Sequence, residues 1–463
     1  MGALPLLHPL SVPDHPLQEP TLNLSETTRP RRSALLCAAV LASTALLATA
    51  CSSSGSSSSG DAGSSAGSAK ITLTVGDFGT FGYKEAGLFD AYMAAHPNIT
   101  IKEDTTTGEA DYWTALQTHL SGGGLDDVQA LEVGRIALAT SDALSNSFED
   151  LSKVKGVNKG DYLPWKWQQA TTQDGRTIGL GTDVGPMAIC YRQDLFQQAG
   201  LPADPAAVTA LWAGDWAKFV QVGKEYQAKA PKGTFFMDSA TGMFNGVVSS
   251  STSQYYKGGK LDYKNSPSVK TAWDLAMQAD AAGESAGLKE FDTPWQTAFA
   301  NSSFATTVCP SWQQANIQKF SGDANSGKWN IAQAPAAGNW GGSFLAVPSA
   351  GKHKAEAEAL VAWLTAPEQQ AKVFQKVGNI PSNQGAYSLT AVTDFKNPYI
   401  GPNAPTGQIF STAAKAIQPA ETGPHAGDLQ SDFSNGILLV EQNHKSATDA
   451  WNTTVQQIDS SVQ

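Results

Sequence analysis

The sequence predicts an α/β protein in which helices cover both faces of an open sheet. Strand-like and helix-like segments alternate from residue 71 onward, in the order strand, loop, helix, strand, helix, strand. Hydrophobic residues make up 41% of the chain, which is enough for a packed core and too many for a disordered protein. The length of 463 residues exceeds what one ordinary core supports, so we expect two or three domains.

The first strand is predicted at residues 71–75, because apolar and polar side chains alternate from Ile71 to Val75. The loop from Gly76 to Gly82 follows it. The next predicted segments are a helix at 83–95, a strand at 99–103, a helix at 109–120 and a strand at 127–131. In open α/β sheets the ligand binds beyond the carboxyl ends of the strands. The loop after the first strand is therefore a candidate ligand contact.

Helix signals dominate the rest of the chain. A helix begins at Asp215, and Thr293 to Gln296 resembles a capping box with Pro294 at the first helical position. A second capping box, Thr365 to Glu368, separates two further helices. The other predicted segments are strands at 304–308 and 343–347 and helices at 312–320, 429–443 and 447–458.

The N-terminus has the pattern of an export signal. Arg29-Pro30-Arg31-Arg32 precedes an uncharged, Ala- and Leu-rich run, which ends in the small residues before Cys51. That ending resembles a bacterial lipobox, so we expect residues 1–50 to be removed and Cys51 to carry lipid. Cleavage without lipidation is the alternative, and Sec and twin-arginine export both stay open. Residues 1–28 are either a spurious upstream start or a disordered extension.

Residues 51–69 are nearly all Ser, Gly and Ala, which is typical of a flexible tether. Beyond the tether, the chain has two cysteines, Cys190 and Cys309, and their spacing fits no zinc site. They form either a disulfide or two buried thiols. The histidines are scattered singly, so we expect no metal and no cofactor. A net charge of −11 argues against nucleic-acid binding.

Enzyme motifs are weak. Gly283-Glu284-Ser285-Ala286-Gly287 matches the nucleophile-elbow pattern, but that motif needs a preceding strand, and residues 269–282 are predicted to be helical. A glycosidase would need two carboxylates on either side of the scissile bond. Four acidic residues are available for that role: Asp126, Asp127, Glu132 and Asp183. A secreted glycoside hydrolase is therefore the alternative to a binding protein.

Tryptophan is the informative residue type, with 12 in the chain against 6 Met. Trp295, Trp312 and Trp340 lie within two residues of Pro or Gly in predicted loops or at helix starts. A pyranose has an apolar face that an aromatic ring can cover, and its hydroxyl rim is bound by Asp, Glu, Asn and Thr side chains. These tryptophans therefore predict a site for a neutral sugar. We expect Trp312 and Trp340 to be stacking platforms rather than core residues, and the two glycines after Trp340 to let a ligand approach the backbone.

Several motifs occur in an order that resembles the family 1 extracellular solute-binding proteins of sugar ABC importers. The resembling stretches are residues 126–132, 183–196, 338–348 and 364–370. The stretch Gly338 to Pro348, together with Cys309-Pro310-Ser311-Trp312, resembles the cellobiose and cello-oligosaccharide branch. The resemblance covers nearly all of residues 71–463.

The resemblance implies a periplasmic-binding-protein-like fold of type II, with the ligand between two lobes. Lobe one would comprise 71–183 and 343–381, and lobe two 186–340 and 384–463. Three crossings would form the hinge, near 183–186, 340–343 and 380–383. The ligand contacts that it implies are Thr80, Phe81, Tyr83, Glu132, Asp183, Trp295, Trp312, Trp340, Gly341 and Gly342.

The same resemblance implies a role and partners. The protein would be a monomer outside the cell, lipid-anchored to the outer face of the cell membrane. It would bind cellobiose or a cello-oligosaccharide without catalysis and deliver it to the permease subunits of an ABC importer. The sequence leaves open the exact sugar, its length and the identity of the permease.

Overall fold

The computed structural model describes residues 69–401 and 404–462. Its first sheet has five strands in the order β2-β1-β3-β11-β4. β1, β2 and β3 run parallel, and β11 runs antiparallel to both β3 and β4. The strands are β1 (Ile71–Phe78), β2 (Ile99–Thr106), β3 (Val128–Glu132), β4 (Leu180–Gly181) and β11 (Ser343–Ala346).

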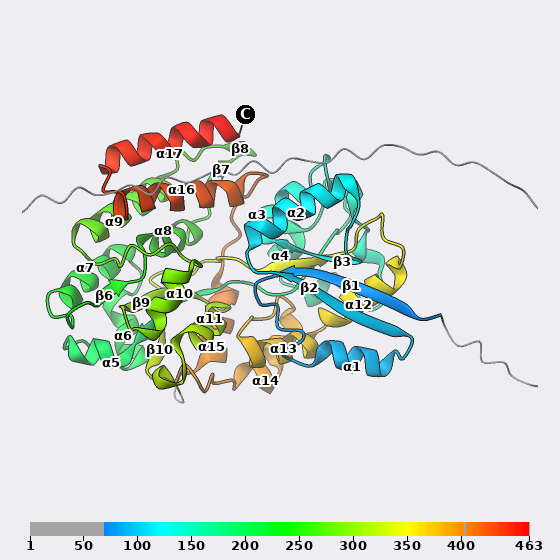
Figure 1. The fold of residues 1–463 in the computed structure, drawn as a ribbon, viewed down its shortest axis with the longest axis horizontal. Coiled ribbons are helices and arrows are strands. Elements are labelled where there is room, and N and C mark those ends of the chain that lie inside the picture. Colours follow the sequence, from blue (N-terminus) through cyan, green and yellow to red (C-terminus); the bar gives the residue numbers. More distant parts are fainter. Residues whose placement is uncertain (1–68, 402–403, 463) are drawn as a thin grey trace, which may run out of the picture. The chain divides into compact units, whose positions relative to one another are not determined.

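Helices cover this sheet and close the first hydrophobic core. Leu73 and Val75 of β1 are fully buried, and β3 is buried along most of its length because it is a central strand. The covering helices are α1 (Leu88–Ala95), α2 (Glu109–Gly122), α3 (Val133–Ala139), α4 (Pro164–Gln169), α12 (Lys354–Leu364) and α13 (Pro367–Val377). These elements form the first lobe, at the right of Figure 1.

The second sheet has four strands in the order β10-β5-β9-β6. β5 runs antiparallel to β10 and β9, whereas β6 and β9 are parallel. The strands are β5 (Met187–Arg192), β6 (Phe235–Met237), β9 (Phe304–Pro310) and β10 (Trp329–Gln333). A separate two-stranded ribbon pairs β7 (Tyr256–Lys257) with β8 (Lys260–Leu261).

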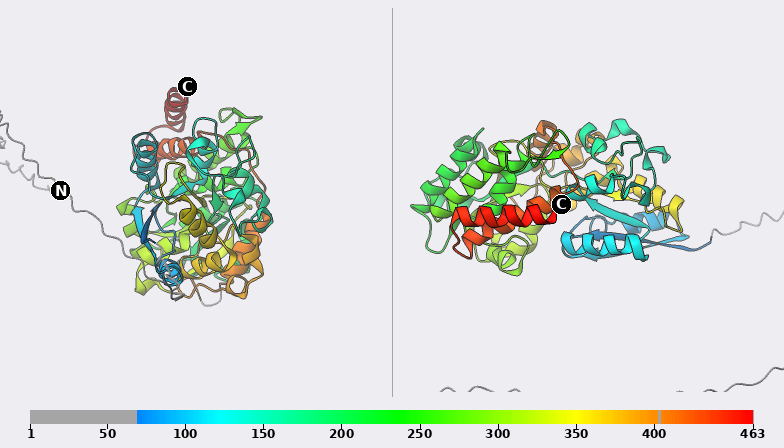
Figure 2. Two further views of the ribbon diagram at one scale, coloured as in Figure 1. Left: turned by 90° about the vertical axis from the view of Figure 1, so that its right-hand side faces the viewer. Right: turned by 90° about the horizontal axis from the view of Figure 1, so that it is seen from above.

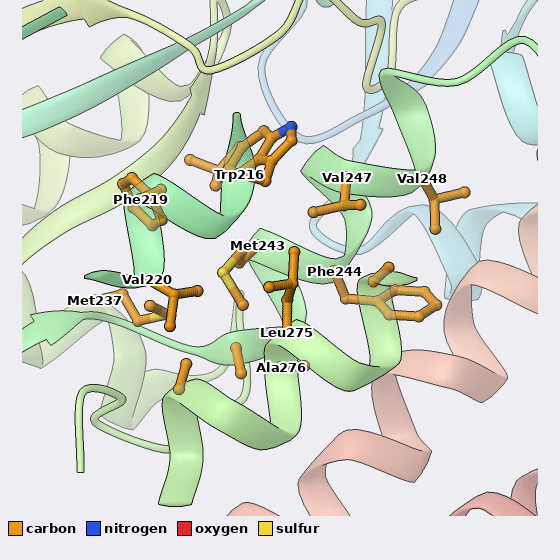
Figure 3. Packing of buried hydrophobic residues seen from close by; sticks show 14 of the residues in the cluster. Trp216, Phe219, Val220, Met237, Met243, Phe244, Val247, Val248, Leu275 and Ala276 are labelled. Carbon is orange, nitrogen blue, oxygen red and sulfur yellow. The ribbon is translucent and has the colours of Figure 1, made fainter. Parts of the chain in front are cut away.

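A helical layer packs on one face of the second sheet (Figure 3). There Trp216, Phe219 and Phe244 contribute large side chains to one buried cluster. Its helices are α5 (Gln193–Gln198), α6 (Pro205–Trp212), α7 (Trp216–Gln227), α8 (Ala240–Ser249), α9 (Pro267–Ala281), α16 (Ala426–Glu441) and α17 (Ala447–Ser461). Figure 2 shows this half beside the first lobe, so the described residues form two lobes.

A third cluster covers the other face of the second sheet. Its helices are α10 (Thr293–Ala300), α11 (Gln313–Ser321), α14 (Thr390–Thr393) and α15 (Thr406–Ala416). The helix α13 joins two clusters, because Val373 and Val377 belong to the first core while Ala371 and Phe374 belong to the third. A boundary at residue 381 therefore places in lobe one a helix that packs on both lobes.

The predicted elements exist, with shifted ends. The two expected capping boxes do not form: α10 begins at Thr293 itself, and Thr365 instead donates its hydroxyl to the Val361 carbonyl oxygen at 2.9 Å. The Gly283–Gly287 motif follows the helix α9, so it lacks the strand that a nucleophile elbow needs. Cys190 and Cys309 form a disulfide between β5 and β9, which settles the choice left open by the sequence.

The expected signal (1–50), lipidated Cys51 and most of the tether (51–69) lie outside the described residues. Within residues 69–401 and 404–462, no helix is both long and apolar enough to cross a membrane.

Candidate functional site

The carboxyl edge of the first sheet collects the predicted contacts of that lobe. β1 ends at Phe78 and leads into the loop with Thr80 and Phe81, and β3 ends at Glu132. Ser343 pairs with Glu132, so the chain enters β11 at this same edge through Gly341 and Gly342. β4 runs parallel to β3 and leads there into Asp183. Four segments far apart in the sequence therefore meet at one edge, as expected for an open α/β sheet.

A buried lysine that sequence reasoning missed lies near both acidic residues of this edge. Lys166 of α4 is fully buried, and its Nζ has no hydrogen-bond partner among the described residues. Burial lowers the pKa of Lys166 to about 8, and the charges of Asp183 and Glu132 oppose that shift. Burial raises the pKa of Glu132 to about 7, and nearby Glu109 adds to the rise.

The carboxylate of Asp183 is held in place by hydrogen bonds, one of them from the start of β11. Its Oδ1 accepts hydrogen bonds from the Ser343 N–H at 2.9 Å and from the Thr182 hydroxyl at 2.7 Å. Burial raises the pKa of Asp183, whereas Lys166 acts to lower it. Asp183, Glu132 and Lys166 together form a polar group with two acids and one base. Such a group can accept hydrogen bonds from hydroxyls and donate hydrogen bonds to them.

Tyr83 and Phe81 are largely buried, and with Asp183 and Asn379 they line a small cavity of about 10 Å³. The Tyr83 hydroxyl and the Asn379 Oδ1 have no hydrogen-bond partner among the described residues. The amide of Asn379 donates to the carbonyl oxygens of Thr80 and Phe81, at 3.1 and 3.3 Å. Asn379 thus ties the loop after β1 to the third predicted crossing, next to partly unsatisfied polar atoms.

The three predicted crossings lie side by side. Asp183 forms an antiparallel bridge with Pro381, and Pro186 forms one with Asn339. The middle segment, 183–186, is therefore flanked by the other two. Met187 pairs with Pro310, so this segment leads directly to the carboxyl edge of β9 in the second sheet. The carboxyl edges of the two sheets are thus connected by these short strands.

The carboxyl edge of the second sheet carries aromatic rings. Trp312 follows β9, is partly buried, and donates its indole N–H to the Trp340 carbonyl oxygen at 2.9 Å. The two rings meet edge to face, with centroids 5.8 Å apart. Trp340 is 7% exposed and belongs to the core of the second lobe. This differs from the expectation that the Trp340 ring lies free of the core.

The two glycines after Trp340 are required by close packing within the protein. Gly341 and Gly342 have φ of 90° and 94°, which side chains rarely adopt. A Cβ on Gly341 would lie 2.8 Å from the Trp312 indole nitrogen, and one on Gly342 would lie 2.8 Å from the Asp183 carbonyl oxygen. We expected these glycines to open space for a ligand, but part of that space holds protein atoms.

Trp295 lies third in α10 and has no exposed surface. Its indole N–H donates to Asp238 Oδ2 at 2.8 Å, and Asp238 follows β6 at the same carboxyl edge. Trp295 therefore packs beneath the surface of this edge. Its contact with a ligand stays a prediction. Beside it lies Phe291, an exposed ring that the sequence did not single out.

A second contact that was missed connects the lobes directly. Arg135 at the start of α3 pairs with Asp428 at the start of α16, and also with Glu109 at 3.1 Å. Gly134 and Gly427 lie beside this pair, so close that a Cβ on Gly134 would lie 2.9 Å from the Gly427 Cα. Arg135 and Asp428 are 293 residues apart, and no sequence pattern relates them.

Among the described residues, no group of three or more His, Cys, Asp or Glu side chains is placed to hold a metal ion. The chemistry available at the facing edges is hydrogen bonding from acids, amides and one lysine, together with aromatic packing.

Comparisons place this architecture among known proteins. A crystal structure of an extracellular solute-binding protein family 1 member is 38% identical, covers 85% of this chain and all of its own, and superimposes with a TM-score of 0.74. That similarity confirms the α/β fold of two lobes. Two curated relatives are more distant. The lactose-binding protein of Rhizobium radiobacter is 26% identical over 59% of this chain. The sn-glycerol-3-phosphate-binding periplasmic protein UgpB of Pectobacterium atrosepticum is 24% identical over 83% of this chain and 88% of its own length.

The alignment with the lactose-binding protein spans 64% of that relative, which is less than two thirds of its length. The family model described as bacterial extracellular solute-binding protein matches residues 87–398, well over half of the chain. The match covers most strands of both sheets and the segment 183–186 that connects them. This protein belongs to the bacterial extracellular solute-binding protein family.

Proposed function

We propose that this chain is the substrate-binding lipoprotein of an ABC importer and that it captures a neutral oligosaccharide. The observation that carries the proposal is that the carboxyl edges of the two sheets are connected and that one is polar and the other aromatic. One edge presents Glu132, Asp183 and Lys166, and the other presents Trp312 beside an exposed Phe291. Polar groups for hydroxyls and rings for C–H faces are what a sugar requires. The lactose-binding relative supports the same ligand class.

The charge of the site favours a neutral ligand over a phosphate. Glu132 and Asp183 are two acids against one base, Lys166, whose pKa is lowered to about 8, so this group offers a phosphate monoester little positive charge. We therefore favour a neutral ligand, although a relative binds glycerol phosphate. Cellobiose or a cello-oligosaccharide is the specific ligand that we propose, on the motif Gly338 to Pro348 and on Trp312.

Capture would occur by closure of the lobes about the three adjacent crossings, with lobe boundaries at 71–183 and 343–381 against 186–340 and 384–463. A ligand that contacts both edges only in the closed state shifts the population toward that state. The predicted contacts Thr80, Phe81, Tyr83, Glu132, Asp183, Trp295, Trp312, Trp340, Gly341 and Gly342 belong to this proposal. The closed monomer would then dock on the permease.

The decisive experiment is a thermal-shift panel, followed by calorimetry of the compounds that bind. The panel contains cellobiose, cellotriose, lactose, maltose and glycerol 3-phosphate. We expect cellobiose or cellotriose to raise the melting temperature, since a ligand at 100 times its Kd stabilises by roughly 2.7 kcal/mol. A shift with lactose or maltose alone would overturn the cello-oligosaccharide assignment. A shift with glycerol 3-phosphate alone would overturn the neutral-sugar proposal.

Two further measurements test the rest of the proposal. Mass spectrometry of membrane-extracted protein should find a lipid-modified Cys51 as the first residue, and an unmodified start elsewhere contradicts the anchor. Incubation with cello-oligosaccharides should release no new reducing ends. A steady release would instead favour the glycoside hydrolase alternative.

A further inference from the structure

Phe291 combines two features that a structural role does not explain. Its side chain is 52% exposed, and it is the one large hydrophobic side chain classed as exposed within residues 69–401 and 404–462. Its φ is 72°, in the left-handed region that disfavours residues with a Cβ. With about half of its surface exposed, the ring gains less from burial than a core residue does, so packing offsets this backbone conformation only in part.

The surrounding segment holds Phe291 in this conformation. The chain before it runs along the carboxyl edge of β6, where the Leu288 N–H donates to the Asp238 carbonyl oxygen at 3.2 Å. The neighbouring Glu290 accepts a hydrogen bond from the Thr241 hydroxyl at 2.9 Å, at the start of α8. On the other side, the Gln296 side-chain amide donates to the Phe291 carbonyl oxygen at 2.9 Å. Both flanks are therefore anchored, and only the ring projects.

The ring lies on a fixed aromatic base. Its centroid is 5.2 Å from that of Trp295, which is fully buried and hydrogen-bonded to Asp238. It is 6.1 Å from that of Trp312, with 38° between the ring planes. Phe291 thus extends the surface begun by Trp312 at the carboxyl edge of the second sheet. Aromatic rings that are rigid below and exposed above are suited to cover the C–H face of a pyranose.

We propose that Phe291 is a ligand-contacting residue that selects for the apolar face of a sugar ring, and that its unfavourable backbone conformation is kept for this contact. The inference rests on the proposed sugar-binding function. If Phe291 served the fold alone, its replacement by glycine at this φ would raise the free energy of unfolding. A residue kept for binding should lose affinity with the same change while the fold gains or keeps its stability.

The test is Phe291→Gly, with Phe291→Leu and Phe291→Tyr beside it. The ligand is the sugar with the largest shift in the panel of cellobiose, cellotriose, lactose and maltose. We expect Phe291→Gly to keep or raise the urea midpoint and to weaken that sugar roughly tenfold or more in calorimetry. Phe291→Leu should also lose affinity, because it is apolar but has no flat ring, whereas Phe291→Tyr should retain it.

The matched control is His444→Gly. His444 has φ of 54° and follows α16. The control relieves a similar backbone conformation away from the aromatic edge, so affinity should not change. Wild-type affinity in both Phe291→Gly and Phe291→Leu would overturn the inference while leaving the sugar-binding function intact. A wild-type protein that binds no sugar in the panel would instead overturn the proposed function, on which the inference rests. If Phe291→Gly fails to fold, the backbone argument is wrong, and the Leu and Tyr variants still decide the contact.

Discussion

Asp428→Asn should weaken sugar binding without touching the sugar, because Asp428 lies where the two lobes meet. Asp428, at the start of α16, pairs with Arg135 at the start of α3. Arg135 has a second acidic partner in Glu109. Removal of the Asp428 charge therefore leaves the buried guanidinium paired, and the substitution tests the contact between the lobes rather than the cost of an isolated charge.

The expected loss of sugar affinity follows from the solvent exposure of the Arg135–Asp428 pair. The side chain of Arg135 is 9% exposed and that of Asp428 is 48% exposed, so water screens the pair from one side. We expect it to contribute about 0.5–1 kcal/mol. If α3 and α16 separate when the lobes open, this energy favours the closed state alone. The Kd of the sugar should then rise by about 2- to 5-fold.

Calorimetry at low salt and at about 1 M salt measures the effect, because exposed charge pairs are screened at high salt. The Kd of Asp428→Asn should exceed that of the wild type at low salt and approach it at high salt. The control is Asp459→Asn, which removes an exposed pair with Lys264 at 2.6 Å within the second lobe. Its Kd should not change. Equal Kd values for Asp428→Asn and the wild type at low salt would refute the role of this pair in closure.

Four other variants test the core and the site. The Cys190→Ala/Cys309→Ala variant should lose about 5 kcal/mol of unfolding free energy, because the bridge closes a loop with a sequence separation of 119 residues; urea melts that match the wild type would contradict this. Glu284→Gln should flatten the pH dependence of stability. Burial raises the pKa of Glu284 from 4.5 to about 8, so the folded protein keeps a proton that the unfolded chain has released. Between pH 4.5 and 8 this group should therefore lower the unfolding free energy of the wild type by about 1.4 kcal/mol per pH unit. Urea melts at pH 5 to 8 measure this slope in both proteins, and equal slopes for Glu284→Gln and the wild type would contradict the reasoning. Trp312→Ala should weaken sugar binding by about 2–4 kcal/mol and should lower the urea midpoint less than Trp340→Ala, because its ring is only partly buried. Trp340→Ala should in addition lose about 3–5 kcal/mol of stability, because its ring is in the core, and an unchanged midpoint would contradict that.

The sequence could predict much of the first sheet because the signals there are local. The alternation from Ile71 to Val75 reports a half-buried strand, and the observed strand extends it to Phe78. The order of elements then places the ends of β1 and β3 at one edge without knowledge of any contact. Helix ends were less predictable, because Thr293 and Thr365 have the residue types of capping boxes but make other hydrogen bonds or none.

Contacts across long sequence separations could not be predicted in the same way. Lys166 lies in the run Trp165-Lys166-Trp167, where a surface lysine would be the ordinary expectation. It is buried because β11 returns to the first sheet and places Gly342 and Phe344 beside it, with its Nζ 3.8 Å from the Phe344 ring. The pairing of Arg135 with Asp428 likewise depends on the two lobes meeting. Neither fact is encoded within a window of neighbouring residues.

The segment Trp340-Gly341-Gly342 shows how a motif can lead to a junction of the fold where its residues are also needed for packing. The motif correctly leads to the junction of the two sheets, because Gly342 immediately precedes β11 and the Trp340 N–H bonds to the Gly185 carbonyl oxygen. Such a junction needs two chains to pass closely, and glycine permits that approach with or without a ligand. A tryptophan beside it can equally fill the core of one lobe. Phe291, the exposed ring that we propose as a ligand contact, has a backbone conformation that no sequence pattern predicts, since its flanks are anchored by hydrogen bonds at Glu290 and from Gln296.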